Sequence, residues 1–180
     1  MYHKGTSARE VPPTEKAPSL EAIVQALGQL SPGDLRVVGD AVAALHKAPI
    51  DSHLFLVDFW GIKLERNEAG DWVGTMPITP QILNPLQIVH GGASYTLADT
   101  VMGWAVWQQY EARKAVVTVE IKMTYLAPGR GKELRAETKI LRAGATLAYT
   151  ECRIQDDRGR LVAAATGTYY TWDPSAALPD

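Results

Sequence analysis

The chain has 180 residues and a formal net charge of −2, with 46% apolar and 21% charged residues, which fits one globular domain plus an appendage. Its basic residues form no cluster of the kind that nucleic-acid binding needs, so no nucleic-acid partner is expected. Neither a signal peptide nor an apolar run of membrane-spanning length is recognisable, which predicts a cytoplasmic protein without a membrane partner.

The first 50 residues are expected to form a tail and two helices. Residues 1–18 mix charges with three prolines, a composition that favours a flexible tail. Apolar residues at helical spacing follow Ser19 and then Ser31–Pro32, where serine is a good N-cap and proline suits the first helical turn. The charges of these helices roughly cancel, which favours a packing or oligomerisation arm over residues 19–50 rather than a DNA-reading helix-turn-helix.

Residues 51–174 show the pattern of one α+β domain. A short helix is expected between Ser52 and Trp60, then a hairpin around the turn at 67–71 and an irregular loop at 79–87. The proline-free run 93–110 predicts the one long helix of the domain, and antiparallel strands follow it through to Trp172. Because a sheet and a helix bury their apolar faces against each other, we expect the sheet to wrap this helix, with residues 175–180 as a tail.

The strand at 115–125 alternates apolar and polar residues throughout. One face of the sheet is therefore predicted to carry Ala115, Val117, Val119, Ile121, Met123 and Tyr125, and the other Thr118, Glu120, Lys122 and Thr124. The single cysteine, Cys152, lies in another alternating run and is expected to be a packed strand residue.

The segment 84–92 followed by Asp99 resembles the signature of hotdog-fold acyl-coenzyme A (acyl-CoA) thioesterases, particularly the phenylacetate-degradation (PaaI-like) group. The resemblance extends over about residues 53–172. It includes the spacing of six residues from Asn84 to His90, the spacing of nine from His90 to Asp99, the strand 117–128 and the closing segment 162–168.

The resemblance implies a hotdog fold, in which an antiparallel sheet wraps one long helix, and hydrolysis of an acyl- or aryl-CoA thioester. It implies no metal and no cofactor other than the CoA of the substrate. It also implies a homodimer or homotetramer, in which each site combines Asn84 and Gly91 of one subunit with Asp99 of another.

The glycine pair at the start of the long helix suits this chemistry on physical grounds. Such a pair leaves backbone N–H groups free and lets a ligand approach, so the Gly91 amide is expected to stabilise the oxyanion and Gly92 to contact the substrate. Asp99 lies about two turns further on the same helix face, among apolar neighbours. On residues alone Asp99 is a solvated or hydrogen-bonded aspartate, or a catalytic one. The resemblance favours a general base or a nucleophile, and the sequence does not separate these two.

Three further polar residues have two interpretations each. The Asn84 side chain is expected to polarise the thioester carbonyl or to hold water, but a turn asparagine explains it equally well. His90 could transfer protons, although the resemblance favours a positioning role in the loop. Thr118 stands where relatives often carry a residue that orients the attacking water, and is otherwise an ordinary strand threonine.

Aromatic and basic residues provide the candidates for substrate binding. Tyr95, Trp104 and Trp107 line an acyl or aryl pocket, or else belong to the core or an interface. Arg130, Lys132 and Arg142 contact the phosphates of CoA, or else are solvated surface residues.

Two other functions remain as alternatives. A hotdog enoyl-CoA hydratase would be expected to carry an aspartate two positions after His90, where this chain has Gly92. A non-catalytic acyl-CoA sensor would not need Asp99 aimed at the thioester. The identity of the acyl group is left open by the sequence.

Overall fold

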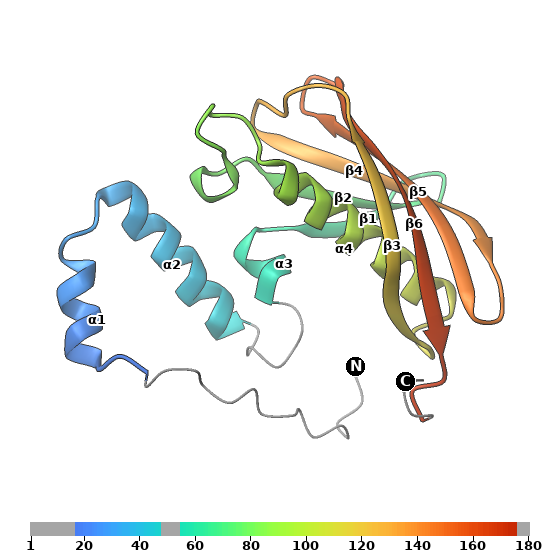
Figure 1. Ribbon diagram of the computed structural model, residues 1–180, viewed down its shortest axis with the longest axis horizontal. Coiled ribbons are helices and arrows are strands. Elements are labelled where there is room, and N and C mark those ends of the chain that lie inside the picture. Colours follow the sequence, from blue (N-terminus) through green and yellow to red (C-terminus); the bar gives the residue numbers. More distant parts are fainter. Residues whose placement is uncertain (1–16, 48–54, 176–180) are drawn as a thin grey trace. The chain divides into compact units, whose positions relative to one another are not determined.

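The computed structural model describes residues 17–47 and 55–175 (Figure 1). The predicted tails lie outside the described residues, except for 17–18 and 175. The chain divides into two compact units, which meet in sequence between Phe59 and Trp60. Within the described ranges, no helix is long and apolar enough to cross a membrane.

The described residues of the first unit, 17–47 and 55–59, form three helices: α1 (Leu20–Leu27), α2 (Pro32–Lys47) and α3 (Phe55–Phe59). The predicted serine N-caps are confirmed, since Ser19 Oγ accepts from the Ala22 N–H and Ser31 Oγ from the Asp34 N–H, each at 3.2 Å. The short helix expected between residues 52 and 60 is confirmed as α3, although residues 52–54 lie outside the described part of the chain.

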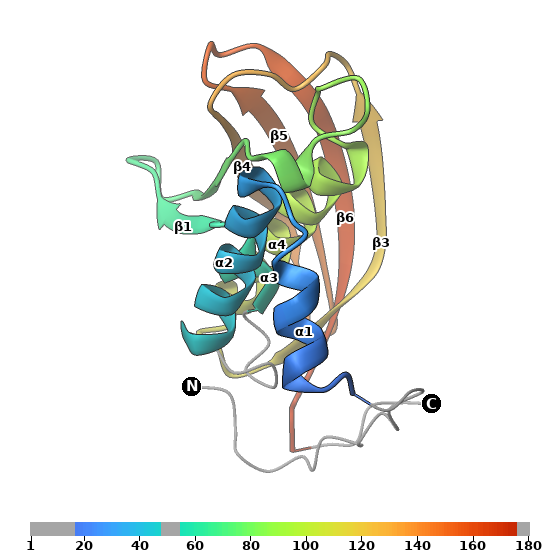
Figure 2. The same cartoon turned by 90° about the vertical axis from the view of Figure 1, so that its left-hand side faces the viewer.

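The second unit is one antiparallel sheet wrapped around one long helix, α4 (Gly91–Gln109), as Figures 1 and 2 show. The strand order is β1-β2-β4-β5-β6-β3. The strands are β1 (Lys63–Arg66), β2 (Trp72–Pro77), β3 (Ala115–Tyr125), β4 (Glu133–Ala143), β5 (Leu147–Asp156) and β6 (Leu161–Trp172). A single 3-10 turn, η2 (Pro80–Ile82), interrupts the loop before α4. The predicted α+β hotdog architecture is confirmed.

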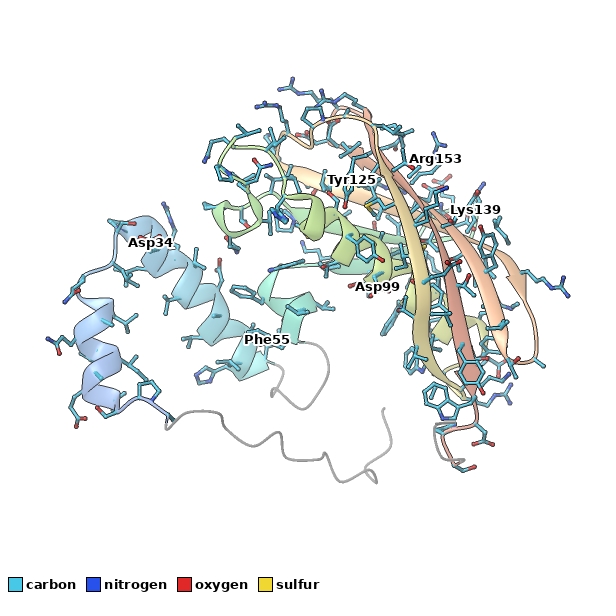
Figure 3. The ribbon with its side chains drawn as sticks, viewed as in Figure 1. Asp34, Phe55, Asp99, Tyr125, Lys139 and Arg153 are labelled. Atoms are coloured by element: carbon cyan, nitrogen blue, oxygen red, sulfur yellow. The ribbon has the colours of Figure 1, made fainter. Side chains whose placement is uncertain are left out.

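The core lies between α4 and the concave face of the sheet. The buried residues of α4 are Ala93, Ser94, Leu97, Ala98, Val101, Met102, Ala105 and Val106. Cys152 is buried on β5, as predicted. On the other face of the sheet, charged side chains such as Lys139 and Arg153 point away from α4 (Figure 3). The sheet is thus apolar on the face that covers the helix and polar on the other.

The uninterrupted alternation predicted for β3 is wrong, because a β-bulge interrupts the strand. Thr118 pairs with Tyr169 of β6, but Glu120 already pairs with Thr168, so that Val119 is an extra residue. One inserted residue moves the side chains before it to the opposite face. Thr118 and Tyr125 are seven residues apart, yet both hydrogen-bond to α4. An unbroken strand would have placed them on opposite faces.

Candidate active site

The loop before α4 is organised around the side chain of Asn84. Its Oδ1 accepts hydrogen bonds from the Leu86 N–H at 2.9 Å and the Ile88 N–H at 3.4 Å, and its backbone N–H donates to Ile88 O at 2.9 Å. The side-chain oxygen of Asn84 therefore has the role of a turn asparagine, which is one of the two predicted interpretations. Its Nδ2 has no acceptor among the described residues and remains a potential donor.

His90 is the N-cap of α4. Its Nδ1 accepts a hydrogen bond from the Gly92 N–H at 2.9 Å, so this nitrogen carries no proton in the observed arrangement. The contact occupies one of the N–H groups that a helix start leaves without an intrahelical acceptor. The ring is thereby held against the first turn of α4, an arrangement suited to positioning the glycine pair.

The preceding N–H group of the helix, that of Gly91, has no acceptor within the described residues. The Gly91 carbonyl accepts a hydrogen bond from the Tyr125 hydroxyl at 2.9 Å, which ties the start of α4 to the end of β3 (Figure 3). Burial, followed by the nearby Tyr95, raises the pKa of Tyr125, so its hydroxyl stays protonated and can donate. A Cβ at Gly91 would lie 3.2 Å from the Tyr125 ring, and glycine therefore permits this close approach.

Asn84 and Gly91 line the same open cleft, whose volume is about 400 Å³. The wall is largely apolar and consists of Asn84, Ile88, Val89, Gly91, Ser94, Tyr125, Leu126, Ala127, Pro128, Gly129 and Val162. A cleft with apolar walls and a few backbone and amide donors can bind a polarised carbonyl group.

Asp99 is held on one side of α4 by two hydroxyl groups. Its Oδ1 accepts from Thr118 Oγ1 at 2.7 Å and from the Tyr169 hydroxyl at 3.2 Å, and the latter lies 3.3 Å from Asp99 O. Tyr169 is fully buried; burial and the Asp99 carboxylate raise its pKa. Sequence reasoning missed Tyr169. The alternation of β6 could place it in the core, but its contact with Asp99 was not readable.

Asp99 does not line the cleft that contains Asn84 and Gly91. Asp99 lies eight residues beyond Gly91 on α4, a rise of about 12 Å at 1.5 Å per residue. The structure therefore brings Asn84, His90 and the glycines together at one end of the helix. Asp99 and Thr118 form a separate cluster further along it.

Comparison with known proteins assigns the family. The Thioesterase superfamily model matches residues 86–163. The proofreading thioesterase EntH of Klebsiella pneumoniae is 32% identical over 105 residues, which cover 58% of this chain and 77% of EntH. The chain belongs to the thioesterase superfamily.

Other relatives agree with this assignment. The 1,4-dihydroxy-2-naphthoyl-CoA hydrolase of Escherichia coli is 29% identical over 106 residues, 59% of this chain and 78% of the relative. The crystal structure of the Bacillus halodurans BH2602 protein with CoA has a TM-score of 0.72 at 30% identity, over 81% of this chain and 97% of that one. The predicted thioester hydrolase is confirmed at the level of the superfamily, and the PaaI-like group stays a prediction.

The aromatic candidates of this thioesterase contact other aromatic or backbone groups. The Trp104 ring lies 5.9 Å from the Trp72 ring, edge to face, and 5.0 Å from the Trp107 ring, measured between centroids. The Tyr95 hydroxyl donates to Ile121 O at 3.1 Å. Trp72 extends this aromatic cluster from α4 onto β2.

The basic candidates lie at opposite ends of β4. Arg130 follows Pro128 and Gly129, which line the cleft. Arg142 lies nine residues beyond Glu133, the first residue of β4, and the strand spans about 30 Å between these two positions. Within one chain, Arg130 and Lys132 both lie in the connection that borders the cleft. For the described residues, no group of three or more His, Cys, Asp or Glu side chains could hold a metal ion.

Proposed function

We propose that this thioesterase hydrolyses an acyl- or aryl-CoA thioester to the free acid and CoA at a site shared by two copies of the chain. Asn84 and Gly91 of one copy would bind the carbonyl group, and Asp99 of the other would act on it. One observation carries this proposal. Two donors that have no acceptor among residues 17–47 and 55–175 meet at one cleft, about 12 Å along α4 from Asp99, the only carboxylate on that helix.

The Gly91 amide and the Asn84 amide group are suited to stabilise the reacting carbonyl oxygen. Attack on a thioester places negative charge on that oxygen, and the positive end of the α4 dipole lies beside it. Loss of one such donor typically lowers kcat by about 100- to 1000-fold. His90 would keep its predicted positioning role, since its ring caps the turn that presents Gly91.

Asp99 is suited to either of two steps. As a general base it removes a proton from water, and the resulting hydroxide adds to the carbonyl carbon before the C–S bond breaks and CoA leaves with its thiolate protonated. As a nucleophile it adds through its own oxygen, expels the CoA thiolate and forms a mixed anhydride, which water then cleaves. Thr118 donates to Asp99, which supports a role in orienting this carboxylate rather than water directly.

The exposed edge of β3 supports association through this strand. β3 is the last strand of the sheet, and its exposed apolar side chains include Val119, which is 59% exposed, and Tyr125, which is 53% exposed. An apolar edge strand left in water is a template for pairing with another chain. We propose that a second copy covers it, in a dimer or in a tetramer built from two dimers.

The binding residues are proposed on the same basis. Gly92, Tyr95 and Arg130 each follow directly a residue that lines the cleft, and they would contact the CoA thioester. Trp104 and Trp107 would line the pocket for the acyl group, because the apolar surface of that group suits an aromatic cluster. Arg142 would contact CoA only from another copy, since it lies about 30 Å from the start of β4.

The proposal is tested by thiol release with 5,5′-dithiobis(nitrobenzoate) over a panel of benzoyl-, phenylacetyl-, hexanoyl- and lauroyl-CoA. We expect turnover by the natural sequence and a fall of about 100-fold or more for Asp99→Ala that remains folded. Binding of these thioesters without any thiol release would contradict the proposal and favour an acyl-CoA sensor.

Sharing of the site is tested with two tagged variants, Asn84→Ala and Asp99→Ala, purified together as heterodimers. One of the two shared sites then carries both changes and the other carries neither. We expect about half of the natural activity to return, although each homodimer is inactive. If each chain contains a complete site, the heterodimer stays inactive and the shared arrangement is wrong.

A further inference from the structure

We infer that Tyr169 is a positioning residue for the reaction: together with Thr118 it holds Asp99 Oδ1, so that Oδ2 is the oxygen that acts on the thioester or on water. This inference rests on the proposed role of Asp99. It adds a buried residue from β6, a strand that supplies none of the groups proposed above.

The hydrogen bonds of Asp99 are unequally divided between its two oxygens. Oδ1 accepts from Thr118 Oγ1 at 2.7 Å and from the Tyr169 hydroxyl at 3.2 Å, whereas no donor to Oδ2 is found in the described part of the chain. A carboxylate oxygen with two donors has most of its lone-pair directions occupied. Oδ2 therefore keeps its lone pairs for a proton or for the carbonyl carbon.

Tyr169 can act only as a donor in this arrangement. It is 1% exposed, and burial followed by the neighbouring carboxylate raises the pKa of its hydroxyl far above the physiological range. Its proton is shared between Asp99 Oδ1 and Asp99 O, at 3.2 and 3.3 Å. The tyrosine thus contacts both the carboxylate and the backbone of the residue that it orients.

Two glycines leave room for the Tyr169 ring. A Cβ at Gly167 of β6 would lie 2.9 Å from Tyr169 Cε2, and a Cβ at Gly103 of α4 would lie 3.4 Å from Tyr169 Cε1. Glycine inside a strand or a helix lowers stability relative to alanine, so its use at both positions needs a reason. Here both glycines give space to the ring, which is thereby fully buried beside Asp99.

The bulge in β3 completes the arrangement. Because Val119 is the extra residue, Thr118 pairs with Tyr169 and both side chains face α4. Their hydroxyls reach the same oxygen from two adjacent strands. Without the bulge Thr118 would share a face with the outward-pointing Glu120, and Tyr169 alone would contact Asp99.

The inference is tested with Tyr169→Phe, which removes only the hydroxyl, in thiol-release assays with benzoyl-CoA and hexanoyl-CoA. We expect kcat to fall by about 10-fold and KM to stay within about 2-fold, because the carboxylate is misdirected while substrate binding is unchanged. Thr118→Val should give a similar fall, and Thr118→Ser, which keeps the hydroxyl, should recover most of that loss.

The matched control is Tyr110→Phe. The Tyr110 hydroxyl also donates to a backbone carbonyl, Gly144 O at 2.6 Å, but it has no contact with Asp99, and its loss should leave kcat within about 2-fold. Thermal unfolding of each variant separates lost stability from lost rate.

Two outcomes distinguish this inference from the proposed function. If Asp99→Ala is inactive but Tyr169→Phe keeps the natural kcat, whatever its melting temperature, the positioning role of Tyr169 is wrong and the proposed function stands. If Asp99→Ala keeps the natural kcat, the proposed function itself fails and this inference fails with it.

Discussion

Gly74 controls how closely α4 approaches the sheet, and Gly74→Ala tests that packing. A Cβ at this position of β2 would lie 2.2 Å from Val101 Cγ2 and 3.4 Å from both Leu64 Cδ2 and Leu97 Cδ1. Heavy atoms in contact need about 3.5 Å, so α4 or β2 must move by about 1 Å. Val101 is fully buried, and a β-branched side chain in a helix has one strongly preferred rotamer, so it cannot turn aside.

The expected size follows from two opposing effects. Overpacking of a filled core costs about 1–3 kcal/mol, and replacing glycine by alanine returns about 0.4–1 kcal/mol through the unfolded chain. We therefore expect Gly74→Ala to lower the free energy of unfolding by about 1–2 kcal/mol. Since α4 carries both Gly91 and Asp99, a shift of the helix should also lower kcat.

The free energy of unfolding is measured by urea titration, with tryptophan fluorescence as the signal. The kcat of the same samples is measured by thiol release. Gly39→Ala is the control, because nothing lies within 4 Å of a Cβ at this position of α2. It should be neutral or should stabilise by up to about 1 kcal/mol. If Gly74→Ala is as stable as the natural chain, the close packing of α4 on β2 is wrong.

Three further predictions concern the loop and its surroundings. Asn84→Asp keeps the oxygen that accepts from the loop N–H groups but removes the amide donor. The free energy of unfolding should therefore stay within about 1 kcal/mol, while kcat falls by about 10-fold or more. An unchanged kcat in the thiol-release assay would exclude the donor role. His90→Ser keeps an N-cap without a titrating ring; kcat within about 5-fold would support positioning, and a loss of about 100-fold would support proton transfer. Burial raises the pKa of Asp156, but hydrogen bonds from Arg160 and Arg158 outweigh it and lower the pKa below its ordinary value. This carboxylate therefore stabilises the fold above about pH 4 and less so as pH falls, so the loss of unfolding free energy between pH 7 and pH 3 should be smaller for Asp156→Asn; an equal loss would contradict the assignment.

Much of the molecule follows from local patterns in the sequence. The capped helices at Ser19 and Ser31, the hairpin, and the single long helix depend on interactions within a few residues, which composition and periodicity report directly. The polar groups at the start of α4 belong to the same class, although the far wall of the cleft, residues 125–129 and 162, comes from distant strands. Asn84, His90 and Gly91 lie within eight consecutive residues, so a loop followed by a helix start is enough to bring them together.

The environment of Asp99 depended on the tertiary structure. Thr118 lies 19 residues from Asp99 and Tyr169 lies 70 residues from it, and their convergence needs both the strand order and the bulge at Val119. A bulge changes the face of a side chain without changing the apolar pattern that predicts the strand, so alternation alone assigned Thr118 to the wrong face. The sequence by itself determined which segments form the helices and strands. Only the packing of β3 and β6 on α4 decided which side chains meet there, because those contacts join segments far apart in the chain.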